Sequence, residues 1–344
     1  MKKAVKGLKD IGEFGFIDRI SPGCLTRPEG VVRAIGDDAA AFRSTPGRLN
    51  LVTTDLLVER VHFLRDAVSG RDLGYKALAV NLSDIAAMGG NAREAFVSLA
   101  VPADCSVDYL DDLYLGMKDL AASFQVNILG GDTTGSEQDL VINIAVWGEV
   151  DEERMLRRDG ASPGDLICST GSLGDSRAGL HLLLNGIQPD SRAMETLLQA
   201  HNLPRPHLEE GSFLAASGGV SSAIDVSDGL SSDLGHLMDQ SGTGALLRSS
   251  SIPLSPELRE FCREFKFDPA EFALAGGEDY TLLFTVPGQA ASDLQEAYRK
   301  EFRKPFHILG EMTSGSELVL ENDDGTRDSL SRTGWNHFSD PSSI

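Results

Sequence analysis

Residues 221–230 read SSAIDVSDGL, a short apolar segment that runs directly into two aspartates, Asp225 and Asp228, placed around Ser227. The apolar residues predict a strand, and the residues from Gly229 onward predict the start of a helix. Asp228 alone has an ordinary explanation, because its carboxylate can cap that helix by accepting backbone N–H bonds. A second acid at Asp225 needs a further reason, and the position of other acids in the chain supplies one.

The chain has 344 residues, a length typical of about two domains. Hydrophobic residues make up 41% and charged residues 24%, and no apolar run approaches the roughly 18 residues of a membrane span. The first residues lack the apolar stretch of a signal peptide, so we expect a soluble, cytoplasmic protein that does not cross a membrane. The cysteines stand far apart in the sequence and predict reduced thiols, with neither a disulfide framework nor a zinc site. They are Cys24, Cys105, Cys168 and Cys262.

The charge balance is strongly acidic, with 52 Asp and Glu against 31 Lys and Arg and a net charge of −21. Such a surface repels nucleic acid, so DNA and RNA are unlikely partners on electrostatic grounds. An acidic protein that handles a phosphorylated small molecule needs cations to neutralise both parties, and metal ions are the obvious candidates.

Strand-like and helix-like stretches alternate through the first part of the chain, which predicts mixed α and β structure. The strands are predicted at 31–36, 48–54, 95–102, 125–131 and 140–150, and the helices at 72–88 and 107–123. Residues 150–164 are charged and then rich in turn residues, so we place a domain boundary near residue 150. The expected domains are 1–150 and 151–344.

The second part shows the same mixture of strands and helices. Strands are predicted at 165–170, 280–286 and 306–312, and helices at 174–185, within 190–217 on both sides of LPRP, at 255–265 and at 289–302. Residues 316–330 predict a hairpin that turns at Asp324 and Gly325. The expected fold class is therefore α/β, with α+β character, in which each domain is a mixed sheet packed with helices.

Aspartates recur where predicted strands end. Asp37 and Asp38 follow the first strand, Asp55 ends the second, and Asp132 follows NILGG. Loops at strand ends commonly hold binding residues, although any single Asp in a Gly-rich turn has an ordinary turn or cap role. Asp84 differs, because it lies in an apolar helix where a carboxylate without a partner is costly. Together with Asp225 and Asp228 these acids suggest one site, a hypothesis that requires them to converge in space.

Convergence would require cations. Two like charges about 4 Å apart repel by about 4 kcal/mol at an effective dielectric near 20, and six acids make many such pairs. Oxygen ligands without a His or Cys cluster suit Mg²⁺ or Ca²⁺, and Mg²⁺ is commonly shared between carboxylates and phosphates. A nucleoside triphosphate fits this pattern. The chain has no GxxxxGK[ST] loop and no protein-kinase motif set, so another nucleotide-binding design is required.

Seven motifs in this order resemble the thiamine-monophosphate kinase family: GEFGFI, GDDAA, TTDLLVERVHF, GYKALAVNLSDIAAMGG, GGDTTGS, IDVSDGLSSDLGH and GGEDYTLLF. That family is grouped with aminoimidazole-ribonucleotide synthetase, selenophosphate synthetase and the hydrogenase-maturation dehydratase. The resemblance implies their shared two-domain ATP-binding fold and a homodimer formed through the first domain. It also implies ATP-dependent, Mg²⁺-assisted phosphorylation of thiamine monophosphate to thiamine diphosphate.

The resemblance further implies roles for individual residues. The residues around the metals would be Asp38, Thr53, Thr54, Asp55, Asp84, Asp132, Asp225 and Asp228. The residues that contact ATP would be Asp38, Tyr114, Gly131, Asp132, Arg158 and Ser227. The thiamine substrate would meet His62, Glu278 and Trp335. We expect no dedicated catalytic base, because a phosphate acceptor is already ionised near neutral pH and transfer can proceed in line.

The substrate residues also have simpler explanations. His62 could pack at a strand edge, Glu278 could close a Gly-rich turn, and Trp335 could cover core surface near the end of the chain. A carboxylate and an aromatic face nevertheless suit the cationic thiazolium ring of thiamine. Lys76 could form a surface ion pair or contact a phosphate.

Two other functions remain open at this point. One is a related synthetase of the aminoimidazole-ribonucleotide or selenophosphate type, although Cys24 in SPGCLTRP lacks the Gly-rich context of a reactive selenophosphate-synthetase residue. The other is a non-catalytic module that binds a nucleotide or a divalent ion. Release of ADP that depends on both Mg²⁺ and thiamine monophosphate distinguishes the kinase from both.

Overall fold

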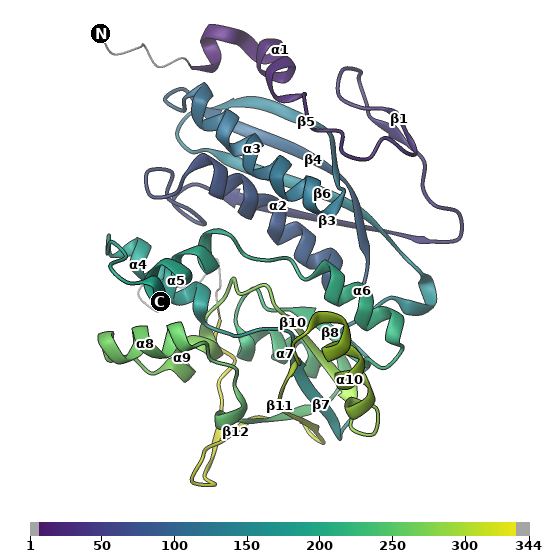
Figure 1. Cartoon of the computed structure of the whole chain (residues 1–344), viewed down its shortest axis with the longest axis vertical. Helices are drawn as coiled ribbons and strands as arrows, with labels where there is room; N and C mark the ends of the chain where they lie inside the picture. The colour runs from purple at the N-terminus through teal and green to yellow at the C-terminus, as the bar shows by residue number, and fades with distance from the viewer. Residues whose placement is uncertain (1–6, 335–344) are drawn as a thin grey trace. The chain divides into compact units, whose positions relative to one another are not determined.

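The computed structural model describes residues 7–334, and the chain separates into two compact mixed α and β units (Figure 1). Unit 1 comprises residues 1–85 and 90–153, and unit 2 comprises residues 86–89 and 154–344. The expected fold class is confirmed, because each unit contains a mixed sheet with packed helices. Across the described residues, no helix has the length and apolar character needed to span a membrane. The four cysteines carry free thiols, as predicted, and all four are buried.

Unit 1 is built on a four-stranded sheet. Its order is β3 (Leu49–Val58), β6 (Val141–Val150), β4 (Asn91–Pro102) and β5 (Asn127–Ser136). The first three strands are antiparallel, and β5 pairs with β4 in parallel. Helices α2 (Gly70–Ala87) and α3 (Val107–Phe124) lie side by side in this unit and confirm the two predicted helices (Figure 1).

The strands that carry the predicted acids are longer than expected. Strand β3 continues to Val58 and β5 continues to Ser136, so Asp55 and Asp132 lie inside strands rather than at their ends. Both are edge strands of the sheet, and polar residues are tolerated where a strand keeps an accessible side. The predicted ends of these strands, at residues 54 and 131, were therefore too early.

Elements before the sheet complete unit 1. Helix α1 (Leu8–Ile20) was not predicted, because Gly12 sits in the left-handed region at φ 71° and interrupts the helical pattern. A two-stranded sheet follows, formed by β1 (Val31–Arg33) and β2 (Ala41–Phe42). The loop between these short strands carries Asp37 and Asp38.

Helices α2 and α3 touch through their backbones. A Cβ atom on Gly74 of α2 would lie 1.8 Å from the carbonyl oxygen of Leu113, and one on Gly116 of α3 would lie 1.8 Å from that of Arg71. Both distances are far below van der Waals contact, so only glycine fits at either position. Helix α2 also carries Asp84, and the crossing therefore fixes the element that presents this acid.

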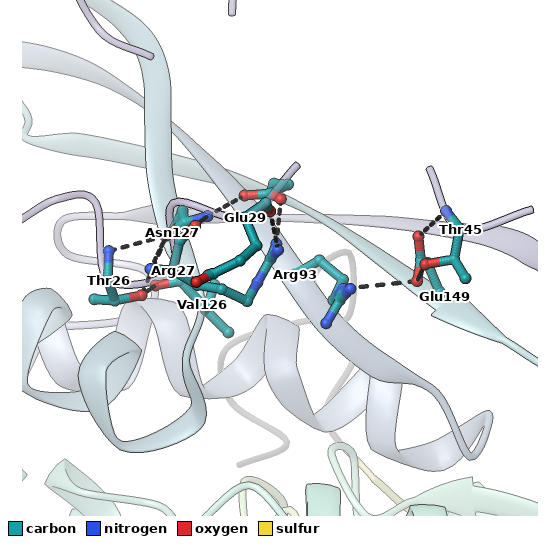
Figure 2. Close-up of polar contacts among 9 residues, drawn as sticks. Thr26, Arg27, Glu29, Thr45, Arg93, Val126, Asn127 and Glu149 are labelled. Carbon is teal, nitrogen blue, oxygen red and sulfur yellow. Dashed lines mark hydrogen bonds and ion pairs between the residues drawn. The ribbon is translucent and has the colours of Figure 1, made fainter. Parts of the chain in front are cut away.

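Glu94, a buried residue of β4, anchors the chain just before β1 through Arg27 and Asn127, which Figure 2 labels. Its carboxylate accepts hydrogen bonds from Arg27 Nη2 at 2.5 Å and from Asn127 Nδ2 at 2.8 Å. The Asn127 Oδ1 atom in turn accepts the backbone N–H groups of Thr26 and Arg27 at 2.9 and 2.7 Å. Burial raises the pKa of Glu94, and these donors offset the cost of its charge.

Glu149, a buried residue of β6, anchors the chain just after β2 (Figure 2). It accepts the backbone N–H of Thr45 at 2.7 Å and the Thr45 hydroxyl at 2.6 Å, and Arg93 Nε lies 3.6 Å away. The segment that carries Asp37 and Asp38 is therefore held to the sheet at both ends by buried carboxylates.

Unit 2 contains a seven-stranded sheet. Its order is β13 (Arg327–Ser329), β12 (Leu318–Glu321), β9 (Gly244–Arg248), β11 (His307–Thr313), β7 (Asp165–Ser169), β10 (Leu282–Pro287) and β8 (Ser222–Asp225). The predicted hairpin is confirmed, because β12 and β13 are antiparallel and Gly325 adopts φ 81° between them. Strand β9 was not predicted; it is short and wholly buried except for Arg248.

The described helices of this unit are α4 (Asp175–Leu184), α5 (Arg192–Asn202), α6 (Leu208–Ser217), α7 (Leu230–Ser241), α8 (Pro256–Phe265), α9 (Pro269–Ala275) and α10 (Ala291–Phe302). All were predicted except α9, a short helix that starts at an Asp-Pro pair. Helices pack in two clusters in this unit: α7 forms a core with the sheet, whereas α4, α5, α8 and α9 pack on one another. Buried side chains of α7, including Leu234 and Leu237, pack with Ile167, Ile224 and Leu283 of the strands. This packing places the N-terminus of α7 at the end of β8.

Candidate functional site

Two turns of unit 2 lie against each other where β8 and β10 meet. Asp225 at the end of β8 pairs with Leu282 at the start of β10. Beyond that pair, the Tyr280 N–H donates to the Val226 carbonyl at 2.8 Å, and the Glu278 N–H donates to the Ser227 carbonyl at 2.8 Å. The DVSDG and GGEDY motifs therefore form a single surface, although 50 positions separate Ser227 from Gly277 in the numbering.

Glycines make this close approach possible. A Cβ atom on Gly277 would lie 2.4 Å from the carbonyl oxygen of Ser227, which is too close for any side chain. Gly229 adopts φ 124° and would place a Cβ 3.0 Å from the carbonyl carbon of Ala275. The glycines of both motifs are thus needed for the turns to meet.

Asp233 organises the first of these turns. Its Oδ2 atom accepts the backbone N–H groups of Ser227 at 3.1 Å, Asp228 at 3.1 Å and Gly229 at 3.0 Å. The sequence had predicted Asp228 as the capping acid of a helix that starts at Gly229. Helix α7 begins at Leu230, one residue after the predicted start. The carboxylate that accepts the N–H groups of residues 227–229 belongs to Asp233, and the capping role of Asp228 stays a prediction.

Three carboxylates gather at this turn. Burial and the nearby charges of Asp225 and Asp228 together raise the pKa of Asp233 to about 7. Asp225 and Asp233 are both nearly inaccessible, at 3% and 1% exposure. Ligand atoms of Asp228, Asp233 and His236 also lie within 4.8 Å of one another. Carboxylates held this close favour a divalent cation, and their oxygen donors fit Mg²⁺.

Glu278 lies in the second turn with its backbone in the left-handed region, at φ 61°. Its Oε2 atom is 3.5 Å from Nδ1 of His201, a buried residue of α5. The same His201 nitrogen is 3.0 Å from the Ser176 hydroxyl. A non-glycine residue in this conformation is uncommon and is found preferentially at functional sites. The position of Glu278 is therefore set both by its backbone conformation and by the contact of its carboxylate with His201.

Asp279 holds the second turn against the start of α4. Its carboxylate accepts the Gly174 N–H at 2.6 Å and the Ser176 N–H at 3.2 Å. Burial raises the pKa of Asp279 to about 8, and the charges of Asp175 and Glu278 act in the same direction. Asp279 thereby links the position of Glu278 to the helix that carries Ser176.

The segment with Arg158 runs beside the free edge of β8. The Ala223 N–H donates to the Arg157 carbonyl at 2.8 Å, and the Ser241 hydroxyl donates to the Arg158 carbonyl at 3.1 Å. The Arg158 residue is exposed. Unit 2 therefore places this predicted ATP contact along the strand that ends at Asp225.

The last described residues reach the same surface. The Ser231 hydroxyl donates to the Thr333 carbonyl at 2.6 Å, and a Cβ atom on Gly334 would lie 2.7 Å from the carbonyl oxygen of Asp228. Trp335, the predicted substrate residue that follows Gly334 in sequence, lies outside the described residues.

In unit 1, Thr53 and Asp84 form a direct contact. The Thr53 hydroxyl donates to Asp84 Oδ2, which joins β3 to α2. The Asp55 N–H donates to Asn81 Oδ1 at 3.1 Å on the same helix. The prediction that Asp84 has a specific partner is confirmed. Asp84 and Thr53 are both partly exposed, so their oxygens remain accessible to a ligand.

The opposite face of this sheet carries a second polar group. Asn143 Nδ2 donates to the Thr54 hydroxyl at 2.8 Å. Asp132 pairs with Ser98, and Ser98 pairs with Asn143, so these three residues share one row of the sheet. Because side chains alternate along a strand, this row faces away from Asp55, which pairs with Ile144 in the adjacent row. The predicted metal residues on the strands of unit 1 therefore lie on opposite faces of the sheet, with Thr53 and Asp55 on one face and Thr54 and Asp132 on the other.

Gly131 is confined to glycine by its surroundings. It adopts φ 151°, and a Cβ atom there would lie 1.7 Å from the carbonyl oxygen of Val97. The backbone next to Asp132 can therefore approach β4 only with glycine at this position. Asp38 lies exposed in the β1–β2 loop, where its N–H donates to Asp37 at 3.0 Å.

Three further predicted residues have local contacts of their own. The Tyr114 ring is 4% exposed and packs edge-on against Phe16 at 5.8 Å, so its described contacts are packing contacts. His62 closes the turn after β3, where its Nδ1 accepts the Val58 N–H at 3.0 Å. Lys76 is buried in α2, which argues against the surface ion pair considered from the sequence.

The structure thus brings some of the predicted residues together, namely Asp225, Ser227, Asp228 and Glu278 in unit 2 and Thr53 with Asp84 in unit 1. Thr54 and Asp132 lie on the other face of the unit 1 sheet. The prediction that the acids of both units share one pocket stays a prediction. Sequence reasoning missed Asp233, Asp279 and His201 as residues of this surface. The signal for Asp233 was available, since it is an acid on an otherwise apolar helix face, the same pattern that singled out Asp84.

Both domains of the chain match protein-family models of one class. Residues 36–150 match the family model "AIR synthase related protein, N-terminal domain", and residues 162–322 match "AIR synthase related protein, C-terminal domain". The two matched domains define an AIR synthase related protein.

Individual relatives narrow this class. The chain is 37% identical to the thiamine-monophosphate kinase of Aquifex aeolicus over 334 residues, which cover 96% of this chain and 99% of the relative. It therefore belongs to the thiamine-monophosphate kinase family. The crystal structure of thiamine-monophosphate kinase from Stenotrophomonas maltophilia K279a is similar, with a TM-score of 0.81, 33% identity and coverage of 92% of this chain and 97% of that chain. The solved structure of AaThiL complexed with AMPPCP and TMP has a TM-score of 0.77 and 32% identity, over 98% of this chain and 100% of that chain.

Proposed function

We propose that the chain is a kinase that transfers the γ-phosphoryl group of ATP to thiamine monophosphate and forms thiamine diphosphate, with Mg²⁺. Relatives named thiamine-monophosphate kinase match nearly the whole chain. One solved relative is a complex with AMPPCP and TMP. The observation on this chain that carries the proposal is the contact between the Ser227 and Glu278 turns. It joins an acid-rich turn suited to a metal–nucleotide complex to a carboxylate suited to a cationic ring.

The proposed transfer is direct and in line. The acceptor phosphate has its second ionisation near pH 6, so a nucleophilic oxygen exists at neutral pH and no general base is needed. Bound Mg²⁺ would supply the positive charge that lets two anionic phosphates approach. Asp225 and Asp228 would hold the metal, and Ser227 and Arg158 would orient ATP. Glu278 would bind the thiazolium ring, so that positioning and electrostatics provide most of the rate.

The remaining assignments follow the family motifs. We propose that the metal residues of unit 1 are Asp38, Thr53, Thr54, Asp55, Asp84 and Asp132. Gly131 would contact ATP, and His62 and Trp335 would complete the substrate site. The contact of Tyr114 with ATP stays a prediction, because the described contacts of this side chain are with the core.

We also propose a homodimer formed through unit 1. Val52 and Leu56 of β3 are 73% and 52% exposed, and both point to the sheet face that carries Thr54. Exposed apolar side chains on a sheet face are typical of an interface. Sedimentation or light scattering should give the mass of a dimer, and Leu56→Glu should shift it to a monomer. We further propose a cytoplasmic location, because a kinase needs a supply of ATP.

The direct test is to incubate the purified protein with ATP, Mg²⁺ and thiamine monophosphate, and to identify the product by mass. We expect thiamine diphosphate and ADP in equal amounts, and neither when a chelator removes Mg²⁺. Formation of ADP only with a purine precursor would favour a synthetase instead. Binding of ATP without its consumption would favour a binding module.

A further inference from the structure

The Asp233 carboxylate is bound to the turn before its own helix rather than to the helix. A capping acid accepts N–H groups of the first helical turn, which here are those of residues 230–232. Asp233 Oδ2 instead accepts the N–H groups of residues 227–229, at 3.0 to 3.1 Å. The Asp233 N–H also donates to the Gly229 carbonyl at 2.9 Å. Asp233 therefore holds the turn with hydrogen bonds from both its backbone and its side chain.

This contact decides which atoms the turn offers to a ligand. Successive backbone N–H groups that point to one place form a nest that binds anions. In this turn the nest is filled by the side chain of Asp233, so its N–H groups are not open to a phosphate. What remains are the Ser227 hydroxyl and the Asp228 carboxylate, both partly exposed. A phosphate would thus bind this turn through the Ser227 hydroxyl and through a cation held by Asp228. It would not bind the backbone N–H groups.

We infer that Asp233 is a positioning residue for the metal–nucleotide complex: it holds residues 227–229 so that Ser227 and Asp228 face the ligand together. This inference rests on the proposed function, because it assigns the turn to ATP and Mg²⁺. Three donors on a single oxygen fix the turn more tightly than one hydrogen bond, and a buried oxygen keeps its partners because no water competes. Loss of the carboxylate would leave three N–H groups unsatisfied and free the turn to rearrange.

The test compares Asp233→Ala with Asp233→Asn in steady-state kinetics. The Asn side chain keeps an oxygen that can accept the same N–H groups, whereas Ala removes the acceptor. For Asp233→Ala we expect the KM for MgATP and the Mg²⁺ concentration at half-maximal rate to rise about tenfold, and kcat to fall about 100-fold. The KM for thiamine monophosphate should change less than about threefold. Asp233→Asn should recover most of the loss.

The matched control is Asp293→Ala, which removes an exposed acid from α10 in the same unit. It should leave all four quantities unchanged. Circular dichroism verifies folding, and Asp233→Ser, whose shorter side chain does not reach the turn, replaces Asp233→Ala if that variant does not fold. Wild-type kinetics for Asp233→Ala or its substitute would overturn the inference. An equal rise in both KM values, or an Asp233→Asn variant as impaired as Asp233→Ala, would also overturn it.

Failure of the proposed function has a separate signature. If the wild-type protein forms no thiamine diphosphate, the kinase assignment fails. Titration calorimetry of MgATP with the same variants then still tests the role of Asp233. Weaker MgATP binding by Asp233→Ala than by Asp233→Asn supports the inference, and equal affinities overturn it.

Discussion

The backbone N–H of Glu278 donates a 2.8 Å hydrogen bond to the carbonyl of Ser227. This bond joins the residue proposed to meet the thiamine ring to the residue proposed to meet ATP. Phosphoryl transfer depends on the relative position of the two bound phosphates. Holding these two turns at a fixed distance would therefore help to align the phosphates for the reaction. Gly277 permits the bond because any side chain there would overlap the Ser227 carbonyl.

Gly277→Ala should therefore lower turnover. The added methyl would force the two turns apart, and a displacement of about 1 Å at a reacting site can cost about 100-fold in rate. We expect kcat/KM for thiamine diphosphate formation to fall at least tenfold. Gly219→Ala is the control, because a Cβ there meets no atom closer than 3.8 Å. Unchanged kinetics in Gly277→Ala would contradict the role of this contact.

Replacing either metal-binding acid of the turn should depress turnover by orders of magnitude. Asp225→Asn and Asp228→Asn keep the size of each side chain but remove one charge, which weakens Mg²⁺ binding. We expect a loss of at least about 100-fold in kcat/KM, comparable to the removal of one strong electrostatic contact from an active site. Circular dichroism should show an unchanged fold. Near-normal activity in both variants would refute their metal role.

The raised pKa of Asp279, about 8, predicts how stability depends on pH. In the unfolded chain this carboxyl has its ordinary pKa near 4, so between about pH 4 and 8 the folded protein holds a proton that the unfolded chain has released. Stability is therefore greatest at the acidic end of this window and decreases as pH rises, by up to about 1 kcal/mol per pH unit.

Urea unfolding midpoints at pH 5.5 and pH 8 test this dependence. The group faces Asp175, Glu278 and the N–H groups of Gly174 and Ser176. Asp279→Asn has no titrating proton at this position, so the wild type should lose more stability than the variant between the two pH values. Equal losses in both proteins would show that Asp279 is ionised throughout the window.

Glu210 of α6 is the centre of a buried charge cluster away from the turns. Its Oε1 atom lies 3.1 Å from Arg205 Nη2, 3.3 Å from His207 Nδ1 and 3.4 Å from Lys304 Nζ, and its side chain is 0% exposed. The cluster joins α6 to the segment that follows α10. Glu210 is thus the buried acid of this cluster, and the exposed Glu209 also lies 3.6 Å from Arg205 Nη2.

Glu210→Ala should destabilise unit 2 by about 1 kcal/mol, because Arg205 and Lys304 are partly exposed and water can solvate them once the carboxylate is removed. The neighbouring Glu209 is 68% exposed, and Glu209→Ala should change stability by less than about 0.5 kcal/mol. Thermal unfolding of both variants measures the difference. Equal midpoints would mean that solvent compensates the basic groups as well as Glu210 does.

Periodicity and turn residues predicted most of the elements, because these signals are local. The long helices at 70–87 and 107–124 and the hairpin at Gly325 are examples. The ends of β3 and β5 were wrong for a physical reason: an edge strand tolerates polar residues on its accessible side, so polarity does not mark where it stops. Short buried strands such as β9 carry too few residues for a periodic signal.

The site was predictable where one residue already conflicted with its surroundings. Asp84 stood out in an apolar helix, and its bond to Thr53 explains it. The partners of Asp233 and Glu278 were not predictable, because they depend on which turns the sheet brings together. The division of the unit 1 acids between two sheet faces likewise depends on strand register. The sequence alone does not determine that register.

The crossing at Gly74 and Gly116 has a mechanical consequence for Asp84. Two helices whose backbones touch cannot slide along each other without steric overlap. Helices α2 and α3 must therefore move as a rigid body. Asp84 near the end of α2 then has no independent freedom along the axis of its helix. Any adjustment needed to admit an ion beside Asp84 falls to β3 and its Thr53 hydroxyl, or to the incoming ligand itself.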